Sequence, residues 1–142
     1  MPAIMSALEF VQLSESDDPV SRERARHDAI SDAAWNDIQL HASESVRVAA
    51  VRNKTVQADR LESCARDPSP NVRHAVAMRR ATSESALRLL ATDTDETVRS
   101  RVAWNPSTPR DILDSLARDP SEVVRTAVRD RLSHQTDGPS VH

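Results

Sequence analysis

Four Val-Arg pairs follow one another in this chain at steps of 26 residues. The valines of these pairs are Val46, Val72, Val98 and Val124. Two apolar columns keep the same spacing: Trp35, Leu61, Leu87 and Leu113 form the first, and Ile38, Cys64, Leu90 and Leu116 form the second. A fixed period of this length indicates a repeated unit, because so short a unit buries its apolar side only by stacking on its neighbours.

Each copy is expected to form two short helices. In the last copy, Thr108 is expected to cap the first helix, with Pro109 at the first helical position. Asp119 is expected to cap the second helix in a capping box closed by Glu122. Helices of about ten residues are marginal alone. We therefore predict an all-α fold, a short α-solenoid of 26-residue two-helix repeats.

The composition excludes several classes of protein. The single glycine, Gly138, excludes the glycine-rich loops that bind nucleotide phosphates. The single cysteine, Cys64, excludes a disulfide framework and fits a reducing compartment. No apolar stretch approaches the about 18 residues of a membrane span, and the N-terminus does not resemble a signal peptide. We expect a soluble, cytoplasmic protein that does not contact a membrane.

The repeats divide the chain. We expect one domain over residues 1–134, with clear copies over about 30–134. A degenerate copy over about 5–29 precedes them and places Val20 in the valine column. Residues 135–142 are expected to form a disordered tail.

Two stretches, "LARDPSEVVRTAVRD" and "VAWNPSTPRDIL", resemble the leucine-rich repeat variant family. Units of that family follow a pattern close to L-x-x-L-A-x-D-x-x-x-x-V-R-x-x-V-A-x-N-P-x-T-P, and the resemblance covers roughly residues 30–134. It implies short paired helices that stack into a right-handed superhelix related in architecture to HEAT-like solenoids. Some members bind an iron–sulfur centre through an N-terminal cysteine cluster. With Cys64 as its single cysteine, this chain does not share that feature.

An arginine follows each repeated valine, giving the column Arg47, Arg73, Arg99 and Arg125. A residue placed identically in every copy usually maintains the repeat. We therefore expect these arginines to pair with the aspartates between the helices, namely Asp67, Asp93 and Asp119. The alternative is a ladder that binds phosphates.

A column that varies between copies is a better indicator of a binding surface. It holds Arg26, Arg52, Met78, Trp104 and Asp130, near the end of each second helix. Aromatic, thioether and arginine side chains are typical of binding hot spots. The predicted partner-binding residues are Arg52, Met78, Arg79, Arg80, Arg101 and Trp104. The alternative for Trp104 is that it folds back as core; Trp35 and Cys64 are expected in the core.

The chain shows no catalytic motif, and its histidines lack metal-ligand spacing. We expect no catalytic residue, cofactor or metal. The leading hypothesis is a non-enzymatic module, a scaffold or adaptor that binds another protein. The alternative is a HEAT-like solenoid that binds nucleic acid through residues 46–110, which carry a net charge of +5 within a chain of net charge −3. The exposed end of the last copy also suggests a homodimer.

Overall fold

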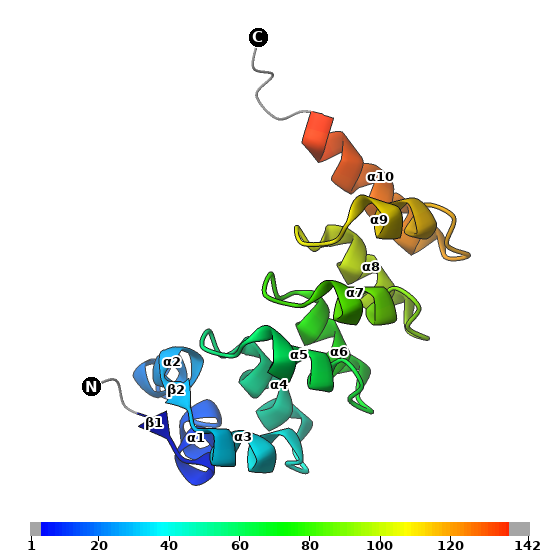
Figure 1. Cartoon of the computed structure of the whole chain (residues 1–142). Coiled ribbons are helices and arrows are strands. Elements are labelled where there is room, and N and C mark those ends of the chain that lie inside the picture. Colours follow the sequence, from blue (N-terminus) through cyan, green and yellow to red (C-terminus); the bar gives the residue numbers. More distant parts are fainter. Residues whose placement is uncertain (1–3, 137–142) are drawn as a thin grey trace.

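The computed structural model describes residues 4–136, and helices make up most of this part (Figure 1). The ten helices found there are α1 (Ala7–Ser14), α2 (Pro19–His27), α3 (Asp32–Gln39), α4 (Glu44–Arg52), α5 (Ala58–Cys64), α6 (Pro70–Ala77), α7 (Glu84–Leu90), α8 (Glu96–Trp104), α9 (Arg110–Leu116) and α10 (Glu122–Thr136). Two short strands, β1 (Ile4–Met5) and β2 (Ala29–Ile30), pair in parallel. The expected all-α class is confirmed.

The helices form two rows. From α3 onward, the odd-numbered helices lie in one row and the even-numbered helices in the other, rising from cyan to red in Figure 1. Each even-numbered helix packs on the next one and on its own odd-numbered partner. The loops that lead from odd to even helices lie along one edge, and the loops that lead from even to odd helices lie along the opposite edge.

One continuous cluster of buried side chains extends through both rows, from Met5 to Val128. The four valines of the Val-Arg pairs are all 0% exposed. The leucine columns are buried as well, and so are Trp35 and Cys64. The predicted apolar columns therefore form the core. No helix of the part described combines the length and the apolar character that crossing a membrane requires.

The first copy departs from this register. Val20, expected in the buried valine column, is 68% exposed, and Ala25 is the buried residue of α2. Met5 and Phe10 are both 0% exposed and fill the core at this end. The expectation for Val20 is wrong because side chains from β1 and α1 occupy the interior that the valine would have entered.

Both predicted helix caps of the last copy are also wrong. The N-cap of α9 is Pro109, without a side-chain bond. The hydroxyl of Thr108 instead donates to the carbonyl of Val102, at 2.7 Å, near the end of α8. Asp119 lies before α10, and its carboxylate accepts from Arg99. These two side chains are buried, so they bond groups inside the stack: a carbonyl near a helix end and a guanidinium.

At its other end α10 extends to Thr136, so the first two residues of the tail predicted over 135–142 are helical and the expectation is wrong there. The rest of the predicted tail lies outside the described residues. Leu132 is half-buried against the core and is thus partly covered by its own chain.

The predicted arginine–aspartate pairs are confirmed for three copies, and each joins two successive helix pairs. They are Arg47–Asp67, Arg73–Asp93 and Arg99–Asp119. In the middle pair, Nε and Nη2 of Arg73 donate to the two carboxylate oxygens of Asp93 at 2.7 and 3.2 Å. Nη1 donates to the carbonyl of Asp67 at 2.8 Å. Arg125 keeps only the corresponding carbonyl bond in the described part of the chain, to Asp119 at 2.7 Å.

A second set of bonds ties each even helix to the one before it. One position per copy supplies the donor, and its occupants are Asn53, Arg79, Asn105 and Arg131. Asn105 Nδ2 donates to the carbonyls of Ala77 and Arg79 at 2.7 and 2.8 Å. Arg131 Nη1 bonds Ala103 and Asn105 in the same way, at 2.9 and 2.7 Å. An amide and a guanidinium thus alternate in one structural role.

Truncating a core leucine tests the buried columns. Leu90→Ala is expected to lower the free energy of unfolding by about 2–5 kcal/mol, because it leaves a cavity where a fully buried side chain stood. Urea denaturation measures this change. The control is Leu40→Ala, at a leucine that is 81% exposed, which should change the value by less than about 0.5 kcal/mol. Equal effects of the two substitutions would contradict the column assignment.

Breaking one arginine–aspartate pair tests its contribution. Asp93→Ala is expected to cost about 3 kcal/mol, because it leaves the guanidinium of Arg73, only 16% exposed, without its counter-charge. Asp114→Ala is the control: its pair with Arg110 is solvent-exposed and should contribute less than about 1 kcal/mol. A loss at Asp93 no larger than at Asp114 would show that the pair does not hold the helix pairs together.

Candidate protein-binding face

Most of the variable column lies near the ends of successive even-numbered helices, but Asp130 lies within α10, which continues to Thr136, so the prediction of a helix end is wrong there. Arg52 and Trp104 are the last residues of α4 and α8, and Met78 is the C-cap of α6. Met78 is 47% exposed although it is a large apolar side chain. Arg26 and Arg52 are exposed as well. The structure therefore places these residues along the edge formed by the loops from even to odd helices (Figure 1).

Trp104 differs from its neighbours in the column because its ring is partly used for packing. The side chain is half-buried against the core. Its ring meets His134 of α10 edge-on, with the ring centroids 5.8 Å apart. The alternative, in which Trp104 folds back into the core, is therefore partly confirmed. One part of the indole packs against α10, and the rest of its surface faces solvent.

Two more of the predicted residues have different surroundings. Nη1 of Arg79 donates to the carbonyls of Val51 and Asn53, and burial lowers the pKa of this guanidinium. Arg79 therefore supports the stack, so its substitution would disturb the fold. Arg80 next to it is exposed, and Arg101 is half-buried on α8.

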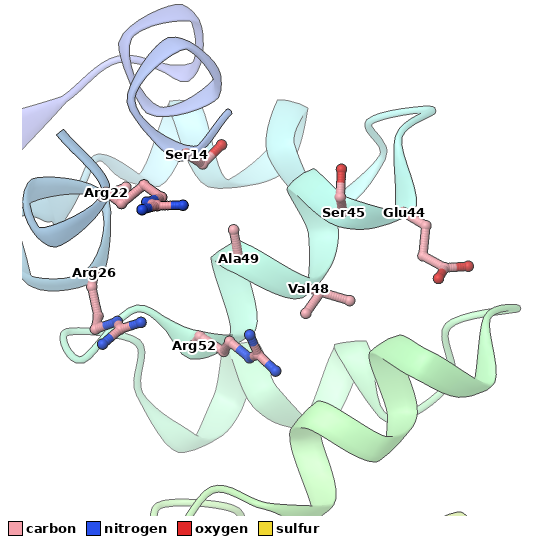
Figure 2. A pocket seen from close by; sticks show the side chains of 9 residues that line it. Ser14, Arg22, Arg26, Glu44, Ser45, Val48, Ala49 and Arg52 are labelled. Carbon is pink, nitrogen blue, oxygen red and sulfur yellow. The ribbon is translucent and has the colours of Figure 1, made fainter. Parts of the chain in front are cut away.

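A hollow of about 390 Å³ opens between α2 and α4 (Figure 2). Its lining consists of Ser14, Arg22, Ala25, Arg26, Glu44, Ser45, Val48, Ala49 and Arg52. Figure 2 shows the guanidinium groups of Arg22, Arg26 and Arg52 around the opening. Arg22 was missed by the sequence analysis because the degenerate first copy gave no dependable register there.

A second hollow, of about 250 Å³, adjoins the first. Arg26 and Arg52 line both, and Lys54, Ala75, Met78 and Arg79 complete the second one. The two hollows share the side chains of Arg26 and Arg52 and lie over α2, α4 and α6; together we call them the basic groove. It contains Arg52, Met78 and Arg79 from the predicted site, whereas Trp104 and Arg101 lie further along, on α8.

The positive charge of this region acts on His74 of α6. Burial lowers the pKa of its imidazole, the charge of Arg101 lowers it further, and Arg52 adds to this effect. Asp95 opposes them by raising the pKa. Arginines of α4 and α8 thus both act on His74.

No group of three His, Cys, Asp or Glu side chains is placed to hold a metal ion within residues 4–136. Burial raises the pKa of the Cys64 thiol to about 12, so this cysteine stays protonated and packs as a small apolar residue.

The lowered pKa of His74 makes stability depend on pH. In the unfolded chain the His74 imidazole binds a proton near the ordinary pKa of 6.5, whereas in the folded protein it binds one only at lower pH. The unfolded state therefore gains more protons as the pH falls through this range, and stability should decline between about pH 7 and pH 5. A histidine titration followed by NMR should show a His74 pKa below 6.5 that rises in Arg101→Gln. A normal His74 pKa, unmoved by that substitution, would contradict this electrostatic account.

No family model, curated protein or solved structure matches this chain. The resemblance to the leucine-rich repeat variant family therefore rests on the sequence motifs alone.

Proposed function

We propose that this chain is a non-enzymatic protein-binding module, a scaffold or adaptor. In this proposal the two rows of helices are a short right-handed α-solenoid of 26-residue units, as in the leucine-rich repeat variant family. The observation that carries the proposal is the exposed Met78 in a groove with Arg26 and Arg52, whose side chains do not bond between helix pairs. The proposal requires no catalytic residue, cofactor or metal ion.

The argument depends on the contrast between repeated and variable positions. The repeated arginines and aspartates bind one another between helix pairs. The variable column holds Arg52, Met78 and Asp130 at equivalent positions, so stacking does not require a particular chemistry there. A flexible thioether between arginines offers the apolar contact and the charged rim that protein interfaces use.

Nucleic acid is the second candidate, and the positive charge of the groove is the observation that favours it. Two acidic groups weigh against it. Glu44 lines the larger hollow, and Glu23 lies 3.9 Å from Arg26. A phosphate backbone in the groove would have to pass close to these carboxylates.

Self-association through the end of the last copy stays a prediction. Arg125 offers a guanidinium without an acidic partner in the described part of the chain, and Val123 on the same helix is 51% exposed. A protein partner on the groove and a second copy on this end would use different surfaces.

A pair of matched substitutions tests the protein-binding proposal. Met78→Asp introduces the residue that Asp130 already places in this column, and Leu40→Asp changes another exposed residue that also follows a helix end. Partners of the parent protein are first captured by crosslinking in the native host. The affinity of the captured protein is then measured for the parent protein and for each variant. Met78→Asp should weaken the complex by about 2 kcal/mol or more, roughly thirtyfold in Kd. Leu40→Asp, on the opposite edge, should not.

Both variants should keep the thermal midpoint of the parent protein, which separates binding from folding. Trp104→Ala is a less specific variant, because the indole also packs against His134 and its loss should reduce stability. A complex that tolerates Met78→Asp, or loses as much affinity with Leu40→Asp, would refute this surface as the binding face.

A further inference from the structure

We infer that the basic groove binds an acidic peptide segment, with carboxylates on the arginines of α2 and α4 and an apolar side chain beside Met78. This inference rests on the proposed protein-binding function and names the chemistry of the partner. Three features of the groove carry it: positive side chains without partners, an apolar lining, and a carboxylate at one end.

Several of the positively charged side chains that line the groove take no part in the contacts between helix pairs. Arg22, Arg52 and Lys54 form no side-chain hydrogen bond and no ion pair with any described residue. Arg26 has only the 3.9 Å contact with the exposed Glu23. By contrast, the arginines between the helix pairs each bind an aspartate or a backbone carbonyl. An anionic partner would supply the counter-charges that these groove residues lack.

The arrangement of the guanidinium groups suits carboxylates. Arg22 and Arg26 lie four residues apart on α2, hence on one face of that helix. Arg52 reaches the same hollow from the end of α4 (Figure 2). The planar guanidinium presents two parallel N–H groups that match the two oxygens of a carboxylate. Two helices thus direct three such groups at one opening.

Part of the lining between the arginines is apolar, beside the hydroxyl groups of Ser14 and Ser45. Val48 and Ala49 line the larger hollow, and Ala75 and Met78 line the adjoining one. These side chains offer contacts to an aliphatic residue of a peptide but no partner for a polar group. A peptide that alternates acidic and apolar residues therefore fits both parts of the groove.

Glu44 favours a peptide over a nucleic acid. Its carboxylate accepts hydrogen bonds from Asn71 Nδ2 at 2.6 Å and from Ser69 Oγ at 2.7 Å. These bonds lower the pKa of Glu44, so the group stays ionised at one end of the hollow. A peptide can place a neutral residue opposite this charge. A nucleic acid carries a phosphate on every nucleotide and has no such freedom.

Fluorescence anisotropy with defined probes tests the inference. The probes are a labelled peptide of 12 residues in which Asp and Glu alternate with Leu and Ser, its Asn/Gln counterpart, and single-stranded DNA and RNA of 12 nucleotides, each at about 0.15 M salt. The proteins are the parent chain, the double variant Arg22→Gln/Arg52→Gln, and the control Arg66→Gln/Arg118→Gln. The control removes two exposed arginines from loops on the opposite edge, where they form no side-chain bond with described residues.

The parent chain should bind the acidic peptide, and the groove variant should weaken this binding by about tenfold or more, whereas the control should not. The Asn/Gln peptide should not bind. Equal losses in the two variants would overturn the inference, and so would an oligonucleotide that binds more tightly than the peptide and depends on Arg22 and Arg52. If no acidic peptide binds while the Met78-dependent complex with a host protein persists, the inference fails and the proposed function stands.

Discussion

The bidentate pair between an arginine of one even-numbered helix and an aspartate of the next helix pair is the contact on which the rest of the structure depends. In the Arg99–Asp119 pair both side chains are largely buried, 14% and 6% exposed, and the carboxylate also accepts from the backbone N–H of Ser121 at 2.8 Å. Each pair therefore fixes the start of a helix and its distance from the previous copy together. Helices of seven to nine residues, as most are here, need such cross-links because they are too short to be stable alone.

The same dependence on neighbours explains how the other polar groups are satisfied. Every buried side-chain nitrogen and oxygen of the described residues has a hydrogen-bond partner. Asn53 illustrates this: its Nδ2 donates to the carbonyls of Ala25 and Asp28, at 2.7 and 2.9 Å, across the boundary between two copies. Arg79 performs the corresponding task one copy later. Buried polar groups are thus satisfied by hydrogen bonds between neighbouring helix pairs, which a single helix pair could not form.

The distribution of charge on the surface follows from this use of arginine. Arg47, Arg73 and Arg99, which join successive helix pairs, are neutralised by aspartates, whereas Arg22, Arg26 and Arg52 line the basic groove. Burial and the charges of Arg101 and Arg52 lower the pKa of His74. The groove therefore carries positive potential on a chain whose net charge is −3. This local excess supports the proposed binding of an acidic protein segment. Met78 provides the apolar contact that charge alone does not supply.

The sequence by itself determined the helical class, the buried columns and the Arg–Asp pairing, because these features recur at one spacing and each copy supports the same interpretation. It also pointed to Arg52 and Met78 as surface residues, since their column varies. Only the tertiary structure decided the roles of Thr108, Arg79 and Arg22. Thr108 donates to the carbonyl of Val102 near the end of a helix, and Arg79 donates to the carbonyls of Val51 and Asn53 in the preceding copy. Arg22 faces a hollow between α2 and α4. Such roles depend on where other parts of the chain place a carbonyl or leave a space, and local sequence carries no record of that.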